Sequence, residues 1–381
     1  MTTHRSRLRT LPLSILAVSA LTLAACTNGE QDATDSAPTT ATGEASTPHT
    51  TTADRTQPTQ AQVPQADQQL ATNLDIQAHR GGRGENTEES RAAFQHAMDL
   101  GVDTLELDIV LSKDGVPVVW HDPKVLPEKC TDTAPSAEGD EQYPYVGSLI
   151  HELTWEQLQT LNCSQALEDF PQAQHAAHNT MLRLEEVFDM AAERGWDGYY
   201  NIETKIEGEH REQSAEPQEF VDTIMAVATT AGTSDKITIQ SFDWRSLEIV
   251  KKQHPDVPTV ALYDETTWFA GSPWIGAADY DAADGDALTA IKKAGFSVAS
   301  PGYAVPYGTA AGDADYHPVT TKEYVDKAHE LGLKVVPWTV NDEATIRDQI
   351  QAGVDGIISD YPSLLVAVAK QYGWQPTHTA S

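Results

Sequence analysis

Residues 104–121 read TLELDIVLSKDGVPVVWH, and this stretch carries the signals that decide the fold. The mostly apolar run 104–111 predicts a β-strand. Because successive side chains of a strand point to opposite faces, Glu106 and Asp108 share one face, while the leucine and isoleucine residues between and beside them occupy the other. Two neighbouring carboxylates stay ionised at low cost only beside a cation. The strand is therefore predicted to contribute charged groups to a functional site.

The second half of the stretch predicts an antiparallel partner for this strand. Only Asp114-Gly115 need separate the first run from the second, Val116–His121, and a two-residue turn connects antiparallel strands. With Asp114-Gly115 as the central pair, Asp108 faces His121 across the hairpin. The hairpin is thus expected to bring a carboxylate and an imidazole together.

The run 104–111 belongs to a series in which a helix, a glycine and a β-rich run follow one another. Leu184, Val187 and Phe188 have helical spacing, Gly195 follows as a terminator, and the run 199–205 comes next. Eight runs are expected to be parallel strands: 75–79, 104–111, 199–205, 237–242, 258–263, 297–300, 334–340 and 356–360. Their alternation with helices over about 300 residues predicts an α/β fold, a (β/α)8 TIM barrel with the antiparallel hairpin strand added.

The segment after the first strand distinguishes the barrel from an open, doubly wound sheet, which is the main alternative. An open sheet of that kind would have a glycine-rich fingerprint here, and His79-Arg80-Gly81-Gly82 is not one. Asn86, with Glu89 three residues later, predicts the start of the first helix.

The N-terminal segment predicts export. An apolar run from Leu11 to Leu23 follows three arginines; it is too short for a membrane-spanning helix and fits the core of a signal peptide. The run ends at Leu23-Ala24-Ala25-Cys26, which resembles a bacterial lipobox, so Cys26 is the expected lipidation residue. Ordinary cleavage after Ala25, with secretion, is the alternative. We expect an extracytoplasmic protein that is attached to the membrane of the bacterial cell envelope through an N-terminal lipid anchor.

Composition divides the chain further. Val63 and Leu70 are the only large aliphatic residues between Thr27 and about Asn73, too few to offset the entropy cost of ordering this segment. The expected organisation is a lipoprotein signal peptide at 1–25, a disordered Thr/Ala/Gln-rich tether at 26–73, a catalytic barrel at 74–370 and a tail at 371–381.

The chain is strongly acidic, with 25 Lys+Arg against 57 Asp+Glu and a formal net charge of −32. This charge excludes nucleic acid as a partner, because affinity for the phosphate backbone requires a basic surface. Three cysteines cannot build a disulfide-rich scaffold, but in an exported protein Cys130 and Cys163 are expected to form a disulfide.

A second strand repeats the charged pattern of the first. In the run 199–205, Glu203 and Lys205 share a face. Glu106, Asp108 and Glu203 would offer a cation oxygen ligands alone, and this set suits Ca²⁺ or Mg²⁺ better than zinc.

Nine short motifs, in order along the chain, resemble those of the glycerophosphodiester phosphodiesterase family. They are His79-Arg80-Gly81, Glu85-Asn86-Thr87, Glu106-Leu107-Asp108, Lys113-Asp114-Gly115, Val118-Val119-Trp120-His121-Asp122-Pro123, Ile202-Glu203-Thr204-Lys205, Gln240-Ser241-Phe242, Trp338-Thr339-Val340-Asn341 and Asp360-Tyr361-Pro362. The loop before Glu85 is shorter than in the family and lacks its proline.

The resemblance implies a metal-dependent barrel enzyme that hydrolyses glycerophosphodiesters, such as glycerophosphocholine or glycerophosphoethanolamine, to glycerol 3-phosphate and an alcohol. It assigns metal binding to Glu106, Asp108 and Glu203, acid–base catalysis to His79 and His121, and phosphate binding to Arg80 and Lys205. Trp338 either packs against the glycerol carbons or is a core aromatic, and Phe242 is expected as a wall of the site. Residues 124–180 resemble the small insertion that the family carries beside its active site.

Two other functions remain open at this point. A phospholipase C- or D-like enzyme would act on intact lipids, and Trp268-Phe269 with Trp274 would be the only small apolar segment available for docking on them. A non-catalytic, solute-binding surface lipoprotein is the alternative from another class, although every expected acid, base and ligand position is filled.

Overall fold

The computed structural model describes residues 64–380. The predicted signal peptide at 1–25, the lipidation residue Cys26 and the predicted tether as far as residue 63 lie outside the described residues. Within the described part of the chain, no helix is both long enough and apolar enough to span a membrane.

Eight parallel strands form the predicted TIM barrel. They are β1 (Asp75–Ala78), β2 (Thr104–Leu111), β7 (Tyr199–Thr204), β8 (Ile237–Ser241), β9 (Thr259–Tyr263), β10 (Val298–Pro301), β11 (Lys334–Val335) and β12 (Gly356–Ser359). Hydrogen-bonded neighbours run in the order β11-β10-β9-β8-β7-β2-β1-β12. The ring closes between β11 and β12, where the amide of Asp355 donates to Val335 O at 2.9 Å and that of Ile358 donates to Pro337 O at 3.1 Å.

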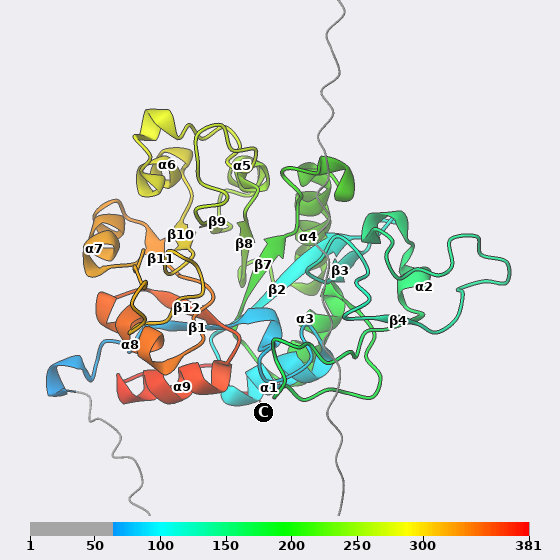
Figure 1. The fold of residues 1–381 in the computed structure, drawn as a ribbon, viewed down its shortest axis with the longest axis horizontal. Helices are drawn as coiled ribbons and strands as arrows, with labels where there is room; N and C mark the ends of the chain where they lie inside the picture. The colour runs from blue at the N-terminus through cyan, green and yellow to red at the C-terminus, as the bar shows by residue number, and fades with distance from the viewer. Residues whose placement is uncertain (1–63, 381) are drawn as a thin grey trace, which may run out of the picture. The chain divides into compact units, whose positions relative to one another are not determined.

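Helices surround these strands, as Figure 1 shows. They are α1 (Arg91–Leu100), α3 (Leu184–Glu193), α4 (Pro217–Ala231), α5 (Trp244–Gln253), α6 (Ala287–Ala294), α7 (Lys322–Glu330), α8 (Glu343–Ala352) and α9 (Pro362–Gln371). Four of them, α1, α4, α6 and α8, end on a glycine. Gly232 after α4, for example, has a φ of 70°, a left-handed conformation that costs glycine little.

The predicted strand 334–340 is shorter than expected, because β11 ends at Val335. Pro337 has no N–H to donate, so a regular ladder cannot continue through it. The segment nevertheless stays beside β10, since the amide of Trp338 donates to Pro301 O.

The hairpin forms, but its predicted register is wrong by one residue. In β3 (Pro117–Val119), Val119 pairs with Ile109 and Val118 with Val110, so Trp120 rather than His121 lies opposite Asp108. The loop has three residues, Lys113, Asp114 and Gly115, and its glycine has a φ of 77°. A three-residue loop ending in a left-handed glycine is a common hairpin connection, and it displaces the pairing predicted from a two-residue turn.

The predicted start of the first helix is also wrong. Helix α1 begins after Ser90, whose side chain accepts a hydrogen bond from the amide of Ala93. Glu89 is instead buried and accepts a hydrogen bond from the amide of Asp108. A carboxylate that the sequence assigns to a helix cap therefore supports β2.

The predicted insertion forms a small unit with its own apolar cluster. It contains β4 (Thr131–Asp132), η3 (Ile150–Glu152), α2 (Trp155–Leu158) and β5 (Leu161–Asn162), and in Figure 1 it projects from the barrel on the side of β3. Strands β4 and β5 pair with each other, and the expected Cys130–Cys163 disulfide is present beside them. Buried residues of the unit, such as Tyr145 and Leu158, share an apolar cluster with Val118 of β3. Directly after the unit, β6 (Leu182–Arg183) pairs with β3.

Residues on both sides of the predicted barrel limits pack against it. Ala71, placed in the predicted tether, is buried, and its amide donates to Tyr372 O at 2.9 Å. Trp374, placed in the predicted tail, is 1% exposed and donates through its indole nitrogen to Asp103 Oδ2. The folded domain therefore extends beyond residues 74 and 370 at both ends.

Replacing Trp374 tests this wider boundary. Trp374→Ala removes a large buried side chain and its hydrogen bond to Asp103, so we expect the free energy of unfolding to fall by about 3–5 kcal/mol. Urea unfolding followed by circular dichroism measures the change. Gln375→Ala, at the neighbouring exposed position, is the matched control; equal stability of the two variants would contradict a structural role for the tail.

Candidate active site

A cavity of about 230 Å³ opens at the carboxyl ends of the barrel strands, where active sites of this fold lie. Eight of the residues predicted for the site line it: His79, Arg80, Glu106, His121, Glu203, Lys205, Phe242 and Trp338. The remaining one, Asp108, is buried next to Glu106 and Glu203. The barrel thus brings all nine residues together, although they are spread over 260 positions of the sequence, from 79 to 338.

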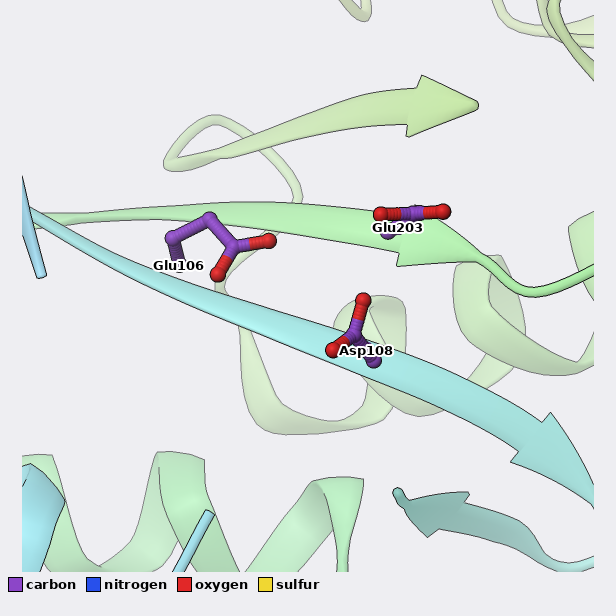
Figure 2. Close-up of side chains that lie close together, drawn as sticks. All are labelled: Glu106, Asp108 and Glu203. Atoms are coloured by element: carbon purple, nitrogen blue, oxygen red, sulfur yellow. The ribbon is translucent and has the colours of Figure 1, made fainter. Parts of the chain in front are cut away.

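Three carboxylates form the floor of the site. Glu106 and Asp108 project from β2 and Glu203 from β7, with Asp108 directly opposite Glu203 in the strand register. Figure 2 shows the three side chains converging between the two strands. One oxygen from each lies within 4.8 Å of the others, and all three residues are buried.

The electrostatics of this cluster fit a divalent cation. Burial, together with Asp108 and Glu203, raises the pKa of Glu106 well above its ordinary value, and burial raises that of Glu203 to about 7. Neither carboxylate oxygen of Asp108 accepts a hydrogen bond from the described residues. Buried oxygens that accept no hydrogen bond are available as ligands, and a set of oxygen ligands alone is the kind that hard cations prefer.

Two cationic side chains hold Asp108 ionised. Arg80 Nε lies 3.0 Å from Asp108 Oδ2, and Lys205 Nζ lies 3.9 Å from Oδ1 and donates to Glu203 Oε1 at 2.8 Å. Burial alone would raise the pKa of Asp108, but Lys205 and Arg80 outweigh it and hold the pKa below its ordinary value. Both cations also face the cavity, where they can meet an anionic substrate.

The loop after β1 aims the backbone of Arg80 at the same cluster. Arg80 has a φ of 51°, which is unfavourable for a residue with a side chain. In this conformation its amide donates to Glu106 Oε2 at 2.8 Å while its guanidinium reaches Asp108. The strain is therefore held by two contacts to the carboxylate floor.

His79 stands at the end of β1 and is oriented by Asp360, a residue for which the sequence predicts no role. Its Nδ1 lies 2.5 Å from Asp360 Oδ1, which leaves Nε2 toward the site, 4.0 Å from Glu106 Oε2. Arg83 Nε and Asn341 Nδ2 donate to Asp360 at 2.9 and 2.7 Å. Burial lowers the pKa of His79, although Asp360 acts in the opposite direction. The lowered pKa favours a neutral histidine that can accept a proton.

His121 reaches the cavity from the end of β3 although it does not pair with Asp108. Its Nδ1 lies 3.0 Å from Asp122 Oδ1. Burial, with Arg80 and Lys205 nearby, lowers its pKa well below the ordinary value. Both histidines therefore have one ring nitrogen facing a carboxylate, an arrangement that fixes the tautomer and orientation of an acid–base imidazole.

An aromatic wall closes another side of the cavity. The ring centroids of Phe242 and Trp338 are 5.2 Å apart and those of Trp338 and Tyr307 5.0 Å apart, and all three residues line the cavity. Trp338 donates through its indole nitrogen to Ser300 O, so it is fixed to the barrel while its ring borders the site. No sequence motif contains Tyr307, so the sequence alone does not predict its place in this wall.

A line of amide side chains inside the barrel supports Glu106. Gln240 on β8 donates to Glu106 Oε1 at 2.5 Å, and Asn201 on β7 donates through Nδ2 both to Gln240 Oε1 and to Gln77 Oε1, each at 2.8 Å. Gln77 in turn donates to Asp75. The alternation of apolar and polar residues in β7 and β8 could have indicated these inward amides, but not their connection to Glu106.

A family model and a curated relative both match most of this chain. Residues 79–364 match the model of the glycerophosphoryl diester phosphodiesterase family. A glycerophosphodiester phosphodiesterase of Caldanaerobacter subterraneus subsp. tengcongensis is 27% identical over 301 residues, which cover 78% of this chain and 98% of that protein.

Solved structures agree with the fold. A crystal structure described as a glycerophosphoryl diester phosphodiesterase from Silicibacter pomeroyi DSS-3 has a TM-score of 0.65 at 26% identity and covers 82% of this chain and 98% of its own. A phosphodiesterase from Oleispira antarctica, solved with the product sn-glycerol-3-phosphate, has a TM-score of 0.54 at 20% identity, covering 77% and 96%.

Removing one ligand tests the carboxylate cluster. We expect MgCl₂ or CaCl₂ to raise the melting temperature of the protein, because a cation that binds only the folded state stabilises it. Asp108→Asn keeps the shape of the side chain and removes its charge. The cation concentration that gives half of the maximal rise in melting temperature should therefore increase about 10-fold or more. Scanning calorimetry at increasing cation concentration measures it. The control is Glu193→Gln, an exposed acid on α3; identical titrations of both variants would contradict the site.

Proposed function

Since the chain belongs to the glycerophosphoryl diester phosphodiesterase family, we propose that the cavity at the carboxyl ends of its strands is the active site and that His79 and His121 are its acid–base pair. The protein is a metal-dependent phosphodiesterase that hydrolyses glycerophosphodiesters to glycerol 3-phosphate and an alcohol. The observation that carries the assignment of residues is the convergence of both histidines, two cationic side chains and three carboxylates on one cavity of about 230 Å³.

We assign the metal to Glu106, Asp108 and Glu203. A divalent cation bound there supplies positive charge to the phosphate oxygens. Carboxylate oxygens without thiolate or imidazole ligands support Ca²⁺ or Mg²⁺ as the ion.

The roles of Arg80 and Lys205 follow from the charge of the substrate. A phosphodiester is an anion and repels a nucleophile until its nonbridging oxygens are neutralised. Both side chains face the cavity and already lie against carboxylates, so they are fixed before substrate arrives. Phe242 and Trp338 offer an apolar wall for the carbon atoms of glycerol.

The two histidines divide the proton transfers. One imidazole removes the proton of the attacking hydroxyl, and the other donates a proton to the oxygen of the leaving alcohol, so the overall charge of the site does not change. Asp360 and Asp122 orient the two rings. When the free glycerol hydroxyl is the nucleophile, attack on phosphorus is intramolecular and gains a large effective concentration; water then opens the cyclic phosphate.

The size of the cavity supports small diesters over intact phospholipids. About 230 Å³ lies below the range of roughly 300–1,000 Å³ typical of pockets for drug-sized ligands. It suits a glycerophosphate with a head group such as choline or ethanolamine. The phospholipase C- or D-like alternative would require room for acyl chains, and the non-catalytic alternative is set aside because the protein is an enzyme.

We further propose that the enzyme is attached to the cell envelope by lipid on Cys26. The Cys130–Cys163 disulfide supports an oxidising compartment outside the cytoplasm. In a bacterial host, Cys26→Ser should move the full-length protein from the membrane fraction to a soluble one, measured by fractionation and immunoblotting, while Thr27→Ala should not. A Cys26→Ser protein that stays with the membrane would contradict the anchor.

The proposed chemistry is tested by resolving the products of glycerophosphocholine hydrolysis. We expect choline and glycerol 3-phosphate in the presence of divalent ion, and loss of turnover with EDTA. His121→Ala should lower kcat by about 100-fold or more, because a general acid or base contributes that much, while His178→Ala, at an exposed histidine, should not. Phosphocholine as the product, or near-native turnover of His121→Ala, would contradict the mechanism.

A further inference from the structure

Lys129 lies between β3 and β4, in the insertion, and its ammonium group joins carboxylates from two separate segments. Nζ donates to Glu88 Oε1 and, at 2.5 Å, to Asp122 Oδ2. The side chain is only 12% exposed, so it is not a flexible surface lysine. No sequence motif contains Lys129.

Each of these carboxylates directs its second oxygen toward a residue of the active site. Asp122 Oδ1 lies 3.0 Å from His121 Nδ1. Glu88 Oε2 accepts a hydrogen bond from Arg80 Nη1 at 3.2 Å. Lys129 is therefore the middle of a continuous chain of contacts that ends on the acid–base His121 at one side and on Arg80 at the other.

The chain depends on the positive charge in its middle. Glu88 is buried, and although burial raises the pKa of its carboxyl, Arg80 and Lys129 outweigh this and hold the pKa below its ordinary value. Without Lys129, Glu88 would keep only arginine partners, Arg80 and Arg83, and would be drawn toward them. Asp122 would lose the donor that holds its other oxygen, so His121 would lose a fixed partner.

The position of Lys129 is itself fixed by the insertion. Cys130 is the next residue, and its disulfide to Cys163 ties the segment to β5. Two residues after Cys163, the amide of Gln165 donates to Lys129 O at 3.2 Å. The ammonium group also lies over the ring of Trp120, 5.2 Å from its centroid. The disulfide and these contacts leave the side chain little freedom to leave the two carboxylates.

We propose that Lys129 is a positioning residue that orients His121 through Asp122 and Arg80 through Glu88, and that the Cys130–Cys163 disulfide holds it in place. The proposal rests on the proposed function, since it assigns Lys129 to the same reaction. It makes the insertion a working part of the catalytic centre, because the insertion supplies the cation that the barrel itself does not place between Glu88 and Asp122.

The test is steady-state hydrolysis of glycerophosphocholine by the full-length protein with saturating MgCl₂ or CaCl₂. Lys129→Met keeps the bulk and removes the charge, and we expect kcat to fall about 10- to 100-fold, the usual cost of losing a residue that orients a catalytic group. Lys129→Arg keeps a cation and should regain most of this loss. Lys124→Met is the matched control: it makes the same charge change at an exposed lysine of the same segment and should leave kcat unchanged.

Two readouts separate positioning from general destabilisation. The cation concentration for half-maximal activity should change far less in Lys129→Met than in Asp108→Asn, because Lys129 reaches the metal cluster only indirectly, through Glu88 and Arg80. Asp122→Asn should not be additive with Lys129→Met: the double variant should be about as slow as the slower single variant. Full additivity, or a Lys129→Met protein as active as Lys124→Met, would overturn the proposal.

The disulfide is tested by the variant in which Cys130→Ser and Cys163→Ser are combined. Its kcat should fall by a similar factor, and adding Lys129→Met should lower it little further. An unchanged kcat in the double serine variant would overturn the role of the disulfide. If the wild-type protein itself fails to hydrolyse glycerophosphocholine, the proposed function fails; if the wild type is active and Lys129→Met equals its control, only the positioning role fails.

Discussion

Three buried carboxylates on two adjacent strands are the constraint around which this barrel is organised. Glu106, Asp108 and Glu203 lie side by side because β2 and β7 pair in a register that sets Asp108 opposite Glu203. Removing such charges from water costs several kcal/mol per ion unless cations and donors compensate. Arg80 and Lys205 provide part of that compensation, and a bound cation would provide the rest. Consequently this side of the barrel interior is polar, whereas an apolar group, Val260, Val298, Val336 and Ile358, fills another part.

The local parts of this organisation follow from the sequence, and the long-range parts do not. Alternation alone places Glu106 and Asp108 on one face of β2, and helical spacing followed by glycine locates the helices, because both signals act over a few residues. The hairpin register was wrong because a three-residue loop with a left-handed Gly115 and a two-residue turn look alike in the sequence. Glu89 was misassigned for a related reason: its spacing fits a helix cap, but it is used to hold the amide of Asp108.

Asp360 stands in one of the nine motifs, but no local pattern reveals its contact with His79. It lies 281 residues from His79, and only the pairing of the last strand, β12, with the first, β1, brings the two together. The same holds for Lys129, whose two partners come from the loop before α1 and from the residue after His121. The residues proposed to bind the metal and the substrate stand in recognisable motifs, while the contacts that orient them depend on the tertiary structure. The sequence therefore predicts which residues lie together in the site more completely than it predicts the contacts that hold them.

The amide side chains inside the barrel form a chain of hydrogen bonds that ends on Glu106 at one side and on Asp75 at the other. These two carboxylates set the direction in which the hydrogen bonds are donated. When ionised, Glu106 and Asp75 can only accept hydrogen bonds, so their neighbours in the chain must donate to them. One residue between them must therefore donate in both directions. That residue is Asn201, whose single nitrogen gives one hydrogen to Gln240 and the other to Gln77. A hydroxyl has one proton and a carboxylate none, so neither serine nor aspartate could serve both neighbours. Conversion of this one asparagine to aspartate, a common chemical ageing reaction of proteins, would turn donor into acceptor and set oxygen against oxygen along the axis of the barrel.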